Sequence, residues 1–197
     1  MSHADRMATL EAADTAIVFA DLQPALVHKS RTHSGEAIAA GAEALARAAD
    51  VLACPMLFSL VGVDGKPAQH LPELAAHARQ ANSFTRTVAR PFDDADFATA
   101  LTATGRGTLV IAGYSSEAVL QYLALDGIAR GYRIVVAIEA CGGRSARAEA
   151  AALRRIERAG AIVTSVADIL QSAEPDMASP RGQSIFGIVH DFMGKDV

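Results

Sequence analysis

Apolar runs and amphipathic segments alternate along most of this chain. Short runs rich in β-branched and other apolar residues are typical of buried parallel strands, whereas apolar positions three and four apart predict helices that cover a sheet. The predicted strands are Thr15–Ala20, Pro55–Leu60, Asn82–Val88, Thr108–Ala112, Arg133–Ile138 and Ala161–Ser165. The predicted helices are Gly35–Asp50, a short one through Leu74 and Ala78, Phe97–Thr104, one from Val119 to Gly131, Ala146–Ala159, Val166–Ser172 and an amphipathic segment at Ile185–Phe192.

This alternation predicts an α/β fold whose parallel strands are joined by right-handed crossovers. Six strands are too few for an eight-stranded barrel, so we expect a three-layer α/β/α, Rossmann-like arrangement around a six-stranded, mainly parallel sheet. The strand Asn82–Val88 is the least apolar and is therefore expected near an edge. With no second core or repeat in the pattern, residues 1–197 are interpreted as a single domain. It has a loose lead-in at 1–14 and a C-terminal segment at 174–197.

The segment from Thr108 to Tyr132 predicts a strand, a tight turn and the N-terminus of a helix. Ser115 or Ser116 offers an N-cap for that helix, and Glu117 places an acid where the helix dipole favours one. Free backbone N–H groups at a helix N-terminus, at the carboxyl edge of a parallel sheet, are suited to binding a negative charge. The sequence therefore predicts a site above this turn.

The composition of the chain indicates which partners and which cellular compartment to expect. The chain has 197 residues with a formal net charge of −4, which makes nucleic acid an unexpected partner. The two cysteines, Cys54 and Cys141, form neither a disulfide framework nor a zinc pattern, as expected in a reducing compartment. The N-terminus lacks the apolar core of a signal peptide, and no apolar stretch approaches the roughly 20 residues of a membrane helix. We expect a cytoplasmic protein with no membrane partner.

No cofactor or metal is predicted from the motifs. The histidines do not show the paired spacing of metal ligands, as the positions of His28, His33, His70 and His77 illustrate. Ser115 and Ser116 lack a histidine base and are interpreted as helix caps rather than nucleophiles.

Three stretches of the chain together carry a resemblance to a known family. They read TAIVFADLQ, SFTRTVARPF and VIAGYSSEAVLQYLALDGIARGYRIVVAIEAC. With these motifs the chain resembles the isochorismatase-like hydrolases, also called the cysteine hydrolase family, from Thr15 to about Phe192. The resemblance implies the same three-layer fold and a small-molecule substrate. Homo-oligomers are usual in that family, so it also implies self-assembly.

In that family an Asp, a Lys and a Cys form the site. By resemblance the Asp is Asp21, the Lys position falls on Arg86, and the Cys position, seven residues into the motif that begins at Gly113, falls on Val119. The resemblance also places a cis peptide bond between Tyr114 and Ser115, and oxyanion-binding N–H groups at Ser115 and Val119. The remaining residues expected to bind substrate are Gln23, Phe92, Tyr114 and Ser116.

Val119 in place of the family's Cys, and Arg86 in place of its Lys, change the chemistry that the site can perform. A thiolate is the nucleophile in covalent amide hydrolysis, and valine cannot replace it. Arginine keeps the positive charge of lysine but offers a planar fork suited to a carboxylate. Other interpretations stay open: Asp21 as a structural cap, Arg86 as a solvated edge charge, Phe92 and Tyr114 as core aromatics, and Cys141 as inert packing near the site mouth.

Two hypotheses follow. The first is a hydrolase of an amide or vinyl ether that uses Asp21 as general acid or base without a covalent intermediate, while Arg86 and the N–H pair hold a negative charge. Family members that cleave the vinyl ether of isochorismate also work without a Cys. The second is a catalytically inactive relative that binds a small anion or assembles with partners. The retained Asp21 favours the first.

Overall fold

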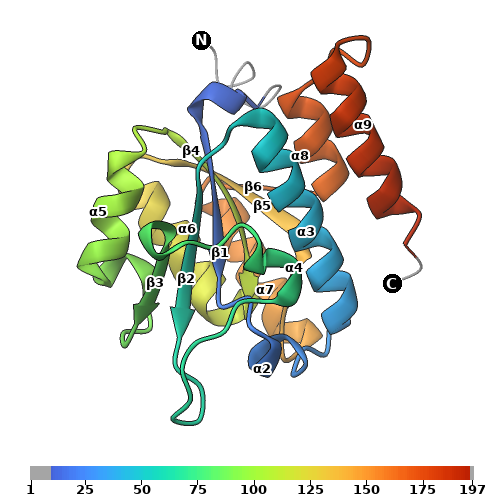
Figure 1. The fold of residues 1–197 in the computed structure, drawn as a ribbon. Coiled ribbons are helices and arrows are strands. Elements are labelled where there is room, and N and C mark those ends of the chain that lie inside the picture. The colour runs from blue at the N-terminus through green and yellow to red at the C-terminus, as the bar shows by residue number, and fades with distance from the viewer. Residues whose placement is uncertain (1–9, 196–197) are drawn as a thin grey trace.

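The computed structural model describes residues 10–195 and shows six parallel strands in one sheet (Figure 1). Their order across the sheet is β3-β2-β1-β4-β5-β6. The strands are β1 Thr15–Ala20, β2 Met56–Val61, β3 Ser83–Arg86, β4 Thr108–Tyr114, β5 Arg133–Gly142 and β6 Ile162–Thr164. The predicted α/β fold with a six-stranded parallel sheet is confirmed, and β3 is an edge strand as expected.

Helices cover both faces of the sheet. The longer ones are α3 Gly35–Leu52, α5 Ala95–Ala103, α6 Gln121–Ala129, α7 Ala146–Arg158, α8 Val166–Ala173 and α9 Pro180–Met193. The short ones are α2 Pro24–Val27, α4 Pro72–Ala75, the π-helical turn η4 Ser116–Leu120 and the 3₁₀ turns η1 Ala12–Asp14, η2 Gln80–Asn82 and η3 Pro91–Asp93. Helices α3, α8 and α9 pack on one face, and α5, α6 and α7 on the other (Figure 1).

The sheet separates two hydrophobic cores. In β1, Ile17 and Phe19 face the core under α3, whereas Ala16, Val18 and Ala20 face the core under α5 and α6. Because both faces are covered, every residue of β1 is buried. This explains why the strand appears in the sequence as a continuous apolar run rather than an alternating one.

The order of the strands reverses between β1 and β4, the two central strands. From β1 the chain continues to β2 and β3 on one side, and from β4 it continues to β5 and β6 on the other side. Such a switch point leaves a crevice at the carboxyl ends of the two strands, where open α/β sheets bind ligands. The register pairs Ala20 with Gly113, so Asp21 and Tyr114 follow directly at this crevice.

Two element boundaries differ from the sequence prediction. Strand β5 continues to Gly142, four residues beyond Ile138, because the end of β4 supplies it with a partner: Gly113 pairs with Cys141 beyond an irregularity in the register. Helix α9 begins at Pro180, five residues before the predicted segment Ile185–Phe192, because the Ser179 side chain caps it and proline is tolerated in a first turn.

The predicted loose lead-in is corrected where the structure describes it. Met1–Thr9 lie outside the described residues. Leu10 is buried in the core, and the Asp14 carboxylate accepts hydrogen bonds from the Gly107 N–H at 2.8 Å and the Thr108 hydroxyl at 3.1 Å. The end of the lead-in is therefore docked against the start of β4. Across residues 10–195, no helix has the length and apolar character to cross a membrane.

Gly113 allows the close approach of β4 to β1 beside the crevice. A Cβ at this position would lie 2.6 Å from the Ala20 carbonyl oxygen. We expect Gly113→Ala to lower the free energy of unfolding by about 1–3 kcal/mol, the usual cost of overpacking. Gly35→Ala is the matched control, because its Cβ would meet only ordinary contacts at 3.8 Å. Urea unfolding of both variants measures the difference, and equal stabilities would show that the backbone can yield here.

Candidate functional site

Asp21 and Arg86 form a buried, two-pronged ion pair at the carboxyl edge of the sheet. Arg86 Nη2 donates to Asp21 Oδ2 at 2.6 Å, and Arg86 Nη1 donates to Oδ1 at 2.8 Å. Asp21 follows β1 and Arg86 ends β3, so the pair reaches across β2. Asp21 is 6 % exposed and Arg86 is 3 % exposed, so Arg86 is not a solvated charge at the sheet edge. The predicted meeting of these two residues is confirmed; their catalytic role remains a proposal.

The backbone around Asp21 turns its carboxylate toward Arg86. Asp21 has φ of 56°, a left-handed conformation that aspartate tolerates better than most residues. Its N–H donates to the Ser59 carbonyl at 2.8 Å, and its own carbonyl accepts from the Gln23 N–H at 2.9 Å. Ser59 also accepts Arg86 Nη1 through its hydroxyl at 3.1 Å. Ser59 was missed by sequence reasoning, although a serine inside the apolar run PMLFSL is a signal that could have found it.

The electrostatics favour a carboxyl group that holds its proton unusually well. Burial raises the pKa of Asp21 above its ordinary value, and the hydrogen bonds and charge of Arg86 offset only part of that effect. Arg86 Nε is buried and has no hydrogen-bond partner among the described residues. The pair thus combines a carboxyl group of raised pKa with a cation that still has a donor to offer.

The turn after β4 contains the predicted cis peptide bond between Tyr114 and Ser115. The helix it opens begins as the π-helical turn η4, in which the Leu120 N–H donates to the Ser115 carbonyl. The prediction that a serine side chain caps this helix is wrong. Ser115 occupies the N-cap position, but its side chain makes no capping hydrogen bond to the described residues. The Ser116 hydroxyl instead shares its single proton between two acceptors, Glu149 Oε1 at 2.8 Å and the Gly142 carbonyl at 3.2 Å.

An apolar side chain occupies the predicted nucleophile position. Val119 is buried in the same core as Ala20 and Cys141. The Cys141 thiol cannot take over, because burial raises its pKa to about 12 and its Sγ donates to the Ala137 carbonyl at 3.1 Å. Cys141 is thus inert packing, the plainer of its two interpretations.

Three of the side chains expected to bind substrate are engaged elsewhere, and this speaks against their direct contact with substrate. Gln23 uses its amide nitrogen and oxygen on the Val61 carbonyl and N–H, at 2.9 and 3.0 Å. Ser116 is bonded to β5 and α7, as described above. Phe92 packs inside the core against Phe97 and Tyr132 and under the Arg130 guanidinium.

Tyr114 points away from the ion pair. Its ring belongs to the core under α3, whereas Ala20 and Val119 face the core under α6. The hydroxyl is buried without a partner in residues 10–195, and burial raises its pKa. Its contact with substrate remains a prediction.

A small cavity lies between the start of α2 and the loop after β2. Its volume is about 100 Å³, and neither Asp21 nor Arg86 is among its lining residues. The residues that line it are Gln23, Pro24, Ala25, Val63, Asp64, Lys66, Pro67 and Gln69. Within residues 10–195, no group of three or more His, Cys, Asp and Glu side chains is arranged to hold a metal ion.

Removing one partner of the ion pair should destabilise the fold. Arg86→Met leaves the Asp21 carboxylate buried and unpaired, which we expect to lower the free energy of unfolding by about 3–5 kcal/mol near neutral pH. Burial raises the folded-state pKa of Asp21, and without Arg86 nothing offsets that effect, so the folded variant binds a proton more readily than the unfolded chain does. The loss should therefore shrink as the pH falls and be smallest below the ordinary pKa of aspartate, where the carboxyl is neutral in both states.

Urea unfolding of the Arg86→Met variant between pH 4 and pH 8 measures this dependence. The double variant Asp21→Asn, Arg86→Met removes both charges and is the control, since it should recover part of the stability and lose the pH dependence. A constant loss across the range would contradict the assignment of a raised pKa to Asp21.

Comparison with known proteins found a matching family model and a similar hydrolase. A family model described as the isochorismatase domain matches residues 15–168. The probable hydrolase YcaC of Escherichia coli strain K12 is 28% identical over 157 residues, which cover 77% of this chain and 74% of the relative.

Two solved structures share the fold closely. YcaC from Pseudomonas aeruginosa, solved with hexane-2,5-diol and covalent acrylamide, has a TM-score of 0.85 and 25% identity, with 94% of each chain covered. YcaC from Escherichia coli, an octameric hydrolase of unknown specificity, also has a TM-score of 0.85, with 24% identity and coverage of 94% of this chain and 93% of that one.

Proposed function

The chain belongs to the isochorismatase family, and from this premise we propose that it hydrolyses a small molecule without a covalent intermediate, using Asp21 and Arg86. The substrate class proposed is an amide or a vinyl ether. The observation that carries the proposal is the buried two-pronged pair of Asp21 and Arg86 at the switch point of the sheet.

Asp21 is proposed as the general acid. An acid is useful when its pKa is raised toward the working pH, and burial moves the pKa of Asp21 in that direction. With a vinyl ether, the Asp21 proton would pass to the alkene carbon and leave an oxocarbenium ion. Water would then add to that ion and return one proton to Asp21. The hemiketal would break its C–O bond as its hydroxyl proton passes to the departing oxygen, which leaves a ketone and an alcohol.

Arg86 is proposed to hold a carboxylate or a developing negative charge. Two of its N–H groups are engaged with Asp21 and one with Ser59, which leaves Nε for a ligand. Protonation of Asp21 would release a further donor, since a carboxylic acid accepts fewer hydrogen bonds than a carboxylate. We assign the backbone N–H groups of Ser115 and Val119 to the same task.

Two findings support a non-covalent route. Val119 has no nucleophilic atom, and the raised pKa of Cys141 keeps that thiol protonated. The alternative, an inactive relative that only binds an anion, has less support, because an acid with a raised pKa is more than anion binding requires.

We also propose that the chain forms a homo-oligomer. YcaC of Escherichia coli is octameric, and it matches this chain along nearly its whole length. The proposal concerns assembly alone and does not depend on the chemistry assigned to Asp21.

The role of Asp21 is tested by a hydrolysis screen of amides and vinyl ethers. We expect Asp21→Asn to lower kcat/KM by about 10²–10⁴-fold, the usual contribution of a general acid. Activity of the wild type should fall as the pH rises through the folded-state pKa of Asp21, because the protonated form is the active one. Asp126→Asn is the matched control, a buried aspartate of α6 paired with Arg90. Equal turnover in wild type and Asp21→Asn would sink the proposal.

Placing a thiol at position 119 gives a second test. In Val119→Cys, a thiol would stand in the first turn of a helix, where its pKa is lowered. We expect native incubation with acrylamide to add one adduct to this variant and none to the wild type, whose Cys54 and Cys141 are both buried. Intact-mass spectrometry measures the adduct. An unmodified variant would show that position 119 does not face the site.

A further inference from the structure

The outward side of α9 exposes large apolar side chains that no residue in 10–195 covers. α9 is the outermost helix on its face of the sheet, and its inner side packs on α3 and α8 through Gly182, Ile185, Ile188 and Val189 (Figure 1). Among the described residues, five large hydrophobic side chains are exposed: Val88, Tyr122, Met177, Phe186 and Met193. The last three of these belong to α9 and the loop that precedes it, so exposed apolar area is concentrated there.

Five exposed residues of α9 form a stripe, because at 100° per residue they fall within an arc of about 120°. This outward stripe is defined as Gln183, Phe186, Gly187, His190 and Met193. It contains no Asp, Glu, Lys or Arg; the other exposed residues of the helix, Pro180, Arg181, Ser184 and Asp191, lie to one side of it. The charged residues nearby remain partly exposed but are paired within the chain, Asp191 with Arg47 at 3.0 Å, Lys195 with Glu43 at 2.6 Å, and Arg181 with Glu174.

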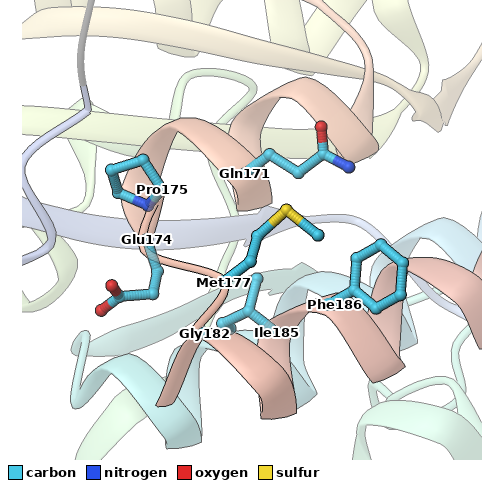
Figure 2. Close-up of a pocket in the computed structure, with 7 residues that line it drawn as sticks. All are labelled: Gln171, Glu174, Pro175, Met177, Gly182, Ile185 and Phe186. Carbon is cyan, nitrogen blue, oxygen red and sulfur yellow. The ribbon is translucent and has the colours of Figure 1, made fainter. Parts of the chain in front are cut away.

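A cavity of about 250 Å³ continues the apolar surface from α9 to the end of α8 (Figure 2). In Figure 2 the Met177 side chain lies between those of Gln171 and Phe186. Pro175 and Ile185 also line the cavity, and the Glu174 carboxylate beside it is neutralised by Arg181. The cavity belongs to the α8–α9 connection rather than to the carboxyl edge that holds Asp21, so it is not an extension of the candidate site.

We propose that the outward stripe is a two-fold interface, at which α9 packs antiparallel on α9 of a second copy of this chain. In a two-fold contact the same patch meets itself, with residue i against residue j and j against i, so a stripe charged with one sign would bring like charges together. The outward stripe avoids that repulsion because its charged neighbours are already paired within the chain. Those ion pairs would form the polar rim that surrounds the apolar centre of an interface.

The spacing of the stripe is self-complementary. α9 runs from Pro180 to Met193, so its midpoint lies between Phe186 and Gly187. An antiparallel pair related about this midpoint places Phe186 opposite Gly187 of the partner subunit, and Gln183 opposite His190 of the partner subunit. A Cβ on Gly187 would meet nothing within 4 Å in its own chain, so the space above it is free for the partner's ring. Each aromatic side chain thus meets a gap on the other copy.

The interface rests on the homo-oligomer proposed above, but not on the chemistry of Asp21. A measured mass and a measured turnover therefore separate failure of the interface from failure of the hydrolase.

The mass of the full chain in solution gives the first test. We expect the wild type to contain an even number of chains by light scattering. Phe186→Asp should reduce the mass to half or less, because it places two carboxylates in the centre of the contact. Tyr122→Asp is the matched control on α6, with similar side-chain exposure, and should leave the mass unchanged. Circular dichroism confirms that both variants fold. A monomeric wild type, or an unchanged mass in Phe186→Asp, would overturn the proposal.

Cross-linking tests the two-fold geometry itself. In Gly187→Cys, two copies of residue 187 would lie close enough for a disulfide, which needs Cα atoms within about 7 Å. We expect oxidation to give a covalent dimer on a non-reducing gel. Ala150→Cys on the exposed side of α7 is the control and should stay monomeric on the gel, since both native cysteines are buried. If the two variants cross-link equally, or neither does, another surface or another partner covers α9 and the proposal is wrong.

Discussion

The burial of one aspartate against one arginine sets the geometry of the carboxyl edge of this protein. Arg86 ends an edge strand, yet its guanidinium reaches over β2 to both oxygens of Asp21. A buried charge is costly unless it is paired, so the three strands must keep their register for the pair to survive. Ser59 and Gln23 maintain that register from β2 and the start of α2, through hydrogen bonds to Arg86, Asp21 and Val61.

The same pair gives the site its chemical character. Burial raises the pKa of Asp21, while Val119, at the predicted nucleophile position, is part of an apolar core. The cis peptide bond and the helix after β4 are present as the family resemblance implied. The roles that we propose for this site are proton transfer and anion binding. These need the acid, the cation and the backbone, and they do not need a nucleophilic side chain.

Charged residues are arranged differently at the carboxyl edge of the sheet and on α9. At the carboxyl edge, charged groups are buried and paired around the candidate site. On α9 and just after it, charged side chains stay partly exposed and are paired with α3 and the end of α8, and the outward stripe itself holds no charged residue. An apolar, uncharged stripe is the kind of surface that a second copy can cover without bringing like charges together.

The sequence alone determined the layers of the fold and the identity of the ion pair. Strands buried on both faces appear as continuous apolar runs, and amphipathic helices repeat at their own period, so both could be predicted from local pattern. Asp21, Arg86, Val119 and the cis bond followed from the family resemblance. Only the tertiary structure decided which side chains are free. Gln23, Ser116 and Phe92 are engaged by Val61, Glu149 and Tyr132, residues distant in sequence that no local pattern connects to them. The strand order, the full length of β5 and the side of the sheet that Tyr114 faces depend on the same long-range packing.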